Sequence, residues 1–330
     1  MLRQADSLGI LERTSAAPAP LPAWARAANA PESDAEAAYL AGAALGRLDA
    51  VVRENPPWAG VFRRRLALGA GAATVRRAGR TEDEAALRDA FHLTRPGADP
   101  GPAGRHLLAW RELVARSLGQ WRASFNAAAA ALGVPHDEAL QEAIAAAEAG
   151  AAGGRPAPFA AAQVFAFARR ALTQGGGHPS RSGRAGEGEL IAAWLADAVL
   201  ARRLKWPFAL PLLAAALFSG AGGRAAADAD GDGDEGAIVF AYAKGAARAC
   251  DLSAELGRRA QRLLAAQPKL RAKGAPAALA ALLDDDSLSA SAKIGGQISE
   301  RGARRLFDRL VALGAIRELT GRATFRLYGL

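Results

Sequence analysis

The last forty residues of the chain change their hydrophobic period part-way, and this change constrains their local fold more than any other feature of the sequence. From Ser299 to Gly314 the apolar residues recur at helical spacing, namely at Ala303, Leu306, Phe307, Leu310 and Val311. Ser299 can cap the start of this helix and Gly314 can end it. Segments 315–319 and 324–328 then alternate apolar and polar residues around Thr320-Gly321. The pattern predicts an amphipathic helix followed by two strands that a tight turn joins.

A helix followed by a hairpin is the arrangement of a winged helix-turn-helix. Two more helices are predicted upstream, at 277–283 and about 289–295, so residues 276–330 would form a small domain of three helices plus a β-hairpin. In such domains the second helix of the turn unit enters the major groove with the face opposite its core stripe. The candidate DNA-binding residues are Arg301, Arg304, Arg305 and Arg309 on the helix, Arg322 in the wing and Arg326 in the last strand.

The distribution of charge favours double-stranded DNA as the partner of this tail. Residues 291–330 hold eight basic and three acidic residues, a net charge of +5 out of +9 for the whole chain of 330 residues. The total basicity is weaker evidence, because only five of the 42 basic residues are lysine and Ala, Gly and Arg dominate throughout. The alternative is a winged helix that docks on a protein partner or on the rest of the chain.

The remainder of the chain is predicted to be helical, so the fold class is mainly α. Alanine, the best helix former, dominates from 34 to about 218, and Gly/Pro clusters divide this stretch into eight to ten helices. Thr81 and Glu84 are expected to form a capping box at the start of one of them. The predicted organisation is a disordered arm at 1–33, a multi-helical body at 34–218, an acidic glycine-rich linker at 219–236, a long helix with its connector at 237–275, and the winged-helix domain at 276–330.

Cysteine content and hydropathy predict a cytoplasmic protein without a membrane partner. Cys250 is the only cysteine, which excludes an internal disulfide and fits a reducing compartment. The N-terminal residues contain no continuous apolar region of the kind that a secretory signal needs. The longest apolar stretch, 208–218, is too short to span a bilayer and is expected to be a buried helix.

Other motifs fail at the positions on which their chemistry depends, so no catalytic residue, metal or cofactor is expected. The acidic run at 228–236 resembles the start of a calcium-binding EF-hand loop, but position 12 of that loop would be Val239. The segment from His178 to Arg184 resembles the catalytic loop of Fic-type nucleotidyltransferases, but it lacks the acid that holds magnesium. The four histidines are scattered, and a capping or core role is favoured for them.

A second basic cluster precedes an acidic stretch. It comprises Arg63, Arg64, Arg65, Arg76, Arg77 and Arg80, and the acids that follow are Glu82, Asp83, Glu84 and Asp89. Pairing with these acids is the favoured interpretation, and a phosphate contact by the helical body is the alternative.

Several motifs together resemble one bacterial family. They are Asn55-Pro-Pro-Trp-Ala-Gly60, Asp99-Pro-Gly-Pro-Ala-Gly104, Lys269-Leu-Arg-Ala-Lys-Gly274 and Arg317-Glu-Leu-Thr-Gly-Arg322. The chain is similar from about residue 35 onward to domain of unknown function family 1403, which occurs mainly in alphaproteobacteria. The resemblance implies no activity and transfers no site residue. We therefore expect a DNA-associated or regulatory protein that could form a homo-oligomer, rather than an enzyme. The alternatives are a protein-interaction module and a diverged Fic-like nucleotidyl transferase.

Overall fold

The computed structural model describes residues 17–26, 29–95, 97–174, 185–218, 235–292, 294, 298–322 and 325–330. Contacts divide the chain into two compact units. The first comprises the N-terminal residues up to Pro20, Glu54–Arg65 and Cys250–Leu330, and the second comprises Leu21–Arg53 and Leu66–Ala249. Both are mainly helical, which confirms the predicted mainly-α class, whereas the predicted domain boundaries stay predictions. No described helix combines the length and the apolar character that crossing a bilayer requires.

The second unit is built from helices alone among its described residues. In chain order they are η1 (Ala23–Ala25), α2 (Asp34–Glu54), most of α3 (Ala59–Arg77), α4 (Glu84–Leu93), α5 (Gly101–Ala115), η2 (Leu118–Gln120), α6 (Trp121–Leu132), α7 (Glu138–Ala152), α8 (Ala157–Gln174), α9 (Ala185–Arg203), α10 (Leu213–Leu217) and the first part of α12 (Glu235–Ala266).

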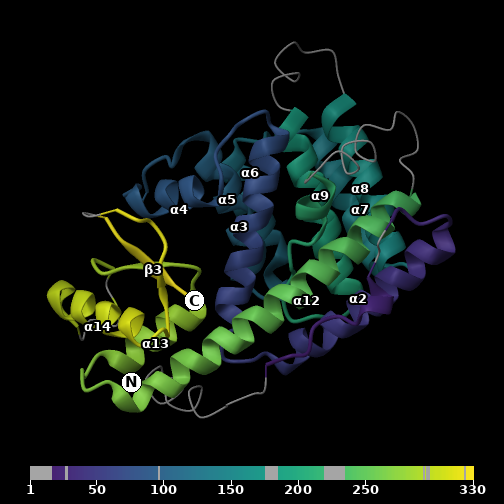
Figure 1. Cartoon of the computed structure of the whole chain (residues 1–330). Coiled ribbons are helices and arrows are strands. Elements are labelled where there is room, and N and C mark those ends of the chain that lie inside the picture. The colour runs from purple at the N-terminus through teal and green to yellow at the C-terminus, as the bar shows by residue number, and fades with distance from the viewer. Residues whose placement is uncertain are drawn as a thin grey trace. The chain divides into compact units, whose positions relative to one another are not determined.

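Helix α9 forms the centre of this unit. Every residue from 190 to 201 is buried, and a helix that is apolar on all sides needs neighbours on all sides. Helices α5, α6, α7, α8 and α10 supply them, and α7 and α8 are seen beside it in Figure 1. The ring of Trp194 packs against Phe125 at 5.4 Å between centroids, and its Nε1 donates to the carbonyl of Ala109 at 3.1 Å. The indole is thereby satisfied within an otherwise apolar core.

The buried Asp197 carboxyl group accepts hydrogen bonds from the backbone at the start of α10. The Asp197 carboxylate accepts from the backbone N–H of Leu212 at 3.1 Å and of Leu213 at 3.2 Å. Burial raises the pKa of Asp197, and burial together with the charge of Asp197 raises the pKa of the buried Tyr242. The expectation of one helix over 208–218 was wrong, because only Leu213–Leu217 is helical. Pro211 explains the late start, since it donates no hydrogen bond and disfavours helical backbone in the residue before it.

The start of α4 also differs from the prediction. The cap is Asp83, whose side chain accepts from the N–H of Ala86 at 2.9 Å, so the capping box expected from Thr81 and Glu84 was wrong. Glu82 instead pairs with Arg80. An aspartate two residues closer to the apolar run of the helix is an equally good cap and starts the helix at Glu84.

The first unit combines the C-terminal part of α12 with a small α/β module. The module contains α13 (Ala275–Asp284), β1 (Leu288–Ser289), α14 (Glu300–Ala312), β2 (Arg317–Glu318) and β3 (Leu327–Gly329), after the 3₁₀ turn η4 (Gln267–Lys269). The strands form an antiparallel sheet in the order β1-β3-β2, and Tyr328 is the register partner of both Leu288 and Glu318. Figure 1 shows β3 with α13 and α14 in yellow and yellow-green.

The first half of this module only partly follows the prediction. The helix expected at 277–283 is confirmed as α13. The helix expected to begin at Ser289 was wrong, because Leu288 and Ser289 pair with Tyr328 and Leu327 as strand β1 and residues 290–292 are not helical. The sheet therefore has three strands where a two-stranded hairpin was predicted.

Candidate nucleic-acid interface

Helix α14 follows from local sequence signals. The Ser299 side chain accepts from the N–H of Gly302 at 3.2 Å, and Gly314, with φ of 66°, ends the helix in the left-handed region. Its buried residues are Ala303, Leu306, Phe307 and Leu310, which lie on one face. The predicted cap and stop are therefore confirmed, and so is the core stripe except for Val311, which is exposed because it lies at the edge of the buried face.

The buried face of α14 is held against the sheet. Phe307 packs on Tyr328 with ring centroids 4.8 Å apart, and Tyr328 is itself buried in β3. Gly329 lies so close to β1 that an added Cβ would be 2.5 Å from the carbonyl oxygen of Asp286. These contacts hold α14 against β3, and β3 against the segment before β1. The opposite face of α14 is therefore the exposed one.

Three of the candidate arginines stand on that exposed face without partners. Arg301, Arg305 and Arg309 are exposed, and among the described residues no hydrogen bond or ion pair engages their guanidinium groups. At 100° per residue Arg301 and Arg305 lie opposite the buried stripe, and Arg309 lies beside them. We call these three residues the arginine ridge.

The other helix and strand arginines are engaged within the module. Arg304 forms an i,i+4 pair with Glu300, and Nη1 of Arg326 lies 4.0 Å from the Asp308 carboxylate. Nε of Arg326 also donates to the carbonyl of Arg322 at 3.3 Å. These four charged side chains line a polar hollow of about 270 Å³, together with Ser289, Ala290, Ser291, Phe325 and Tyr328. The structure therefore separates the six predicted DNA-binding residues into an unpaired ridge and a paired group, with Arg322 exposed in the turn.

Glu318 organises the turn that carries Arg322. Its carboxylate accepts from the N–H groups of Thr320 at 2.8 Å and Gly321 at 2.9 Å and from the Thr320 hydroxyl. Burial raises the pKa of Glu318, but these hydrogen bonds and the charge of Arg326 outweigh it, so that the pKa lies below its ordinary value. Gly321 has φ of 64°, a left-handed conformation that glycine adopts without strain. The sequence indicated the Thr-Gly turn but not the role of Glu318.

A buried ion pair supports the module within the first unit. Arg65 pairs with Asp286, which is 3% exposed, and its Nη2 reaches the carbonyl of Leu330 at 3.4 Å. Nη1 of Arg259 on α12 donates to the same carbonyl at 2.8 Å. This cluster could not be predicted from the sequence, since Arg65 and Asp286 are 221 residues apart.

The basic cluster at 63–80 is therefore only partly paired as predicted. Arg80 pairs with Glu82 as expected, whereas Arg77 forms a bidentate pair with Glu189 at 2.6 and 2.8 Å, and Arg65 pairs with Asp286. Burial lowers the pKa of Arg63, and the charge of Asp284 opposes that effect. Arg65, Arg77 and Arg80 thus form ion pairs within the protein. This favours ion pairing over a phosphate contact as the role of the cluster.

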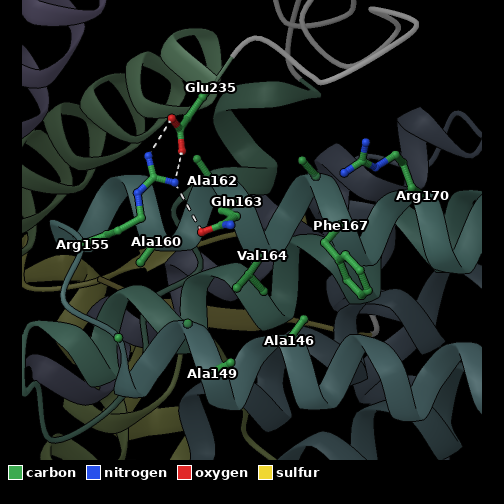
Figure 2. Close-up of a pocket in the computed structure, with 13 residues that line it drawn as sticks. Ala146, Ala149, Arg155, Ala160, Ala162, Gln163, Val164, Phe167, Arg170 and Glu235 are labelled. Carbon is green, nitrogen blue, oxygen red and sulfur yellow. Dashed lines mark hydrogen bonds and ion pairs between the residues drawn. The ribbon is translucent and has the colours of Figure 1, made fainter.

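A second hollow, in the second unit, was not predicted from the sequence. It measures about 650 Å³ and lies over small residues of α7 and α8 (Figure 2). At one end the two Nη atoms of Arg155 each lie 3.0 Å from a carboxylate oxygen of Glu235, and Nη1 donates to Gln163 at 3.3 Å. Alanine is the most frequent of the residues drawn in Figure 2, Val164 lies near the middle, and Phe167 and Arg170 lie toward the other end. Because its one carboxylate is held by Arg155, the hollow offers no evident acid–base chemistry.

Comparison with known proteins places nearly the whole chain in one family. The family model described as Protein of unknown function (DUF1403) matches residues 11–330. The chain belongs to the DUF1403 family. No curated protein matches it. The description of DUF1403 specifies no activity, so the function of this chain must be argued from its own residues.

Two motifs of this DUF1403 chain lie outside the described residues. They are the Fic-like segment that begins at His178 and all but the last two residues of the acidic run at 228–236. Within the described part of the chain no three His, Cys, Asp or Glu side chains are grouped as metal ligands would be. The arginine ridge is therefore the site on which a functional argument can be built.

Proposed function

We propose that residues 275–330 form a winged helix-turn-helix that binds double-stranded DNA, and that the protein is a DNA-associated regulator in the cytoplasm. The observation that carries the proposal is the arginine ridge, Arg301, Arg305 and Arg309, exposed and unpaired on a helix whose opposite face is buried. The element order α13-β1-α14-β2-β3 and the sheet order β1-β3-β2 support a winged helix.

The ridge has the chemistry that major-groove recognition requires. A guanidinium group has five donors in a fixed fork, which suits both a phosphate and the O6/N7 edge of guanine. Helix α14 is 13 residues long, or about 20 Å, enough to lie across the major groove. Arg305, opposite the buried stripe, would approach the base edges most closely. Arg322 in the turn and Arg326 in the last strand would contact phosphates, so they would add affinity without base preference.

The test is a salt titration of duplex binding by the full-length protein, measured by fluorescence anisotropy with a random-sequence duplex. Arg305→Ala should weaken binding about tenfold or more and change the preferred sequence. Arg322→Ala should weaken binding of all duplexes alike and lower the salt slope by about one. Arg304→Ala is the matched control on the same helix, because Arg304 is paired with Glu300, and it should have a smaller effect than Arg305→Ala.

Two results would overturn the proposal. One is that neither Arg305→Ala nor Arg322→Ala alters DNA retention. The other is that the wild-type protein fails to bind any duplex at low salt, where phosphate contacts are strongest. In the second case the module would be sought in complexes with protein partners instead.

A further inference from the structure

An aromatic pair is exposed on the second unit. Trp24 is 65% exposed and Tyr39 of α2 is 60% exposed, and their ring centroids lie 6.2 Å apart. The other large apolar side chains that are exposed in the described residues, Leu93, Phe167 and Val311, lie on three different helices. Adjacent exposed aromatic rings are typical of surfaces that bind another protein.

The face of α2 that continues from Tyr39 is also open. Leu40, Ala44, Leu48 and Val51 form the buried stripe, whereas Tyr39, Gly42, Gly46 and Ala50 are exposed and follow one another at helical spacing on the other side. The aromatic pair therefore lies at one end of a helix face whose other exposed residues are glycine and alanine. We call this surface the α2 face and define it by Trp24, Tyr39, Gly42, Gly46 and Ala50.

Gly42 and Gly46 differ from most glycines inside the described helices. A Cβ added to Gly42 or Gly46 would meet no atom within 4 Å. A Cβ would instead meet an atom at 3.3 Å or less at Gly71, Gly104, Gly150, Gly245 and Gly257. Glycine in a helix interior costs about 1 kcal/mol relative to alanine, the residue that this chain uses most freely in helices. Close packing within the chain explains those other glycines, but it does not explain Gly42 and Gly46.

We propose that the α2 face binds the α2 face of a second copy of this chain, with the two helices antiparallel. In that arrangement Tyr39 of each copy packs over Gly46 of the other. The charges of the helix are complementary in the same register, because Glu36 comes opposite Arg47 at the edge of the face. The midpoints of the aromatic pair and the charged pair fall within one residue of each other, or about 1.5 Å along the helix. One two-fold axis near residue 42 therefore satisfies both pairs.

The existing contacts of the charged side chains of α2 are compatible with the proposal. Arg53 pairs with Asp49 in its own helix at 2.7 Å, and Glu36 accepts from the N–H of Glu32 at 2.8 Å. The carboxylate of Glu36 retains sites for a further partner at the surface. The pair with Arg53 also offsets the charge of Asp49, which would otherwise repel Glu36 of the other copy.

Sedimentation velocity of the full-length protein over about 1 to 100 µM tests the proposal, and a dimer is the expected result. Gly42→Gln with Gly46→Gln should raise the dissociation constant by more than about tenfold, because side chains now fill the space between the helices. The same variant should melt at an equal or higher temperature, since Gln is a better helix former than Gly. Ala145→Gln, at an exposed position of α7, is the matched control and should stay dimeric.

A cysteine probe tests the register. Gly42→Cys lies next to the two-fold axis and should give a disulfide-linked dimer on mild oxidation, whereas Ala145→Cys should not. The native Cys250 is buried and is not expected to interfere. The proposal is overturned if the wild-type protein is monomeric throughout the concentration range, or if the double Gln variant dimerises as well as the wild type. It is also overturned if a dimer forms without the Gly42→Cys cross-link, because the copies then meet elsewhere.

Discussion

Replacement of His106 by glutamine should remove a specific acid sensitivity from the fold. His106 lies on α5, is 4% exposed, and its Nδ1 has no hydrogen-bond partner among the described residues. Its pKa is lowered from 6.5 to about 4, because burial and, to a smaller extent, the charge of Arg80 disfavour the protonated imidazole, and the charge of Glu82 only partly opposes them. A protonated imidazole is therefore unfavourable in the folded protein, whereas the unfolded chain accepts the proton at its ordinary pKa.

The magnitude follows from linkage between protonation and folding. Because the folded-state pKa is the lower one, the unfolded state binds more protons between pH 6.5 and about 4, and acid destabilises the fold in this range. At pH 5 the histidine of the unfolded chain is protonated, about 1.5 pH units below its pKa of 6.5, whereas that of the folded protein is still mostly neutral. Protonation therefore favours the unfolded state by about 2 kcal/mol, at 1.36 kcal/mol per unit. The full effect below about pH 4 is roughly 3.4 kcal/mol. At pH 8 both states are neutral at this residue and the effect vanishes.

Urea unfolding followed by far-UV circular dichroism at pH 8.0, 6.5 and 5.0 measures this effect. The free energy of unfolding of His106→Gln, relative to the wild type, should improve by about 2 kcal/mol from pH 8.0 to pH 5.0. His136→Gln is the matched control, because His136 is exposed, and its pH dependence should follow the wild type. Parallel pH profiles for the wild type and His106→Gln would refute the argument.

Three further substitutions test the packing and the buried charges. Gly245→Ala should lower the free energy of unfolding by about 1–3 kcal/mol, measured by urea unfolding, because its Cβ would overlap the carbonyl of Leu212. Asp286→Ala should cost about 3–5 kcal/mol in the same assay, since it leaves Arg65 without its buried partner. The raised pKa of Asp197 makes the wild type lose stability as pH rises above 3.8, and Asp197→Asn should flatten that slope in a urea series.

The helices were the most predictable part of this protein, and α14 shows why. A serine cap, an apolar stripe and a glycine stop act within a few residues of each other, so the sequence alone specifies where the helix begins and ends. The same reasoning placed α13, and the apolar pattern of the last residues indicated strands. Thr81 shows its limit, since Asp83 is an equally good cap two residues away and only the structure distinguishes them.

The candidate site was predicted as a set of six arginines, and the tertiary structure divided that set. Sequence position put Arg304 and Arg305 side by side, yet one is paired with Glu300 and the other is unpaired in the described part of the chain. Helical periodicity turns neighbours in sequence about 100° apart in space, so adjacent residues face different surroundings. The contribution of each arginine therefore depends on which acids the fold brings near it.

By itself the sequence determined the helical class, the amphipathic α14 and the basic character of the C-terminal tail, because propensity, capping and charge content are local properties. Only the tertiary structure decided that Leu288 and Ser289 form a strand, because strand pairing requires Tyr328 and Leu327 from the far end of the module. It likewise decided that Arg65 forms an ion pair with Asp286. It also left Gly42 and Gly46 exposed, whereas most other helical glycines pack closely against neighbouring segments. Such contacts join residues that are distant in sequence, so they form only when the chain folds and buries its apolar surface.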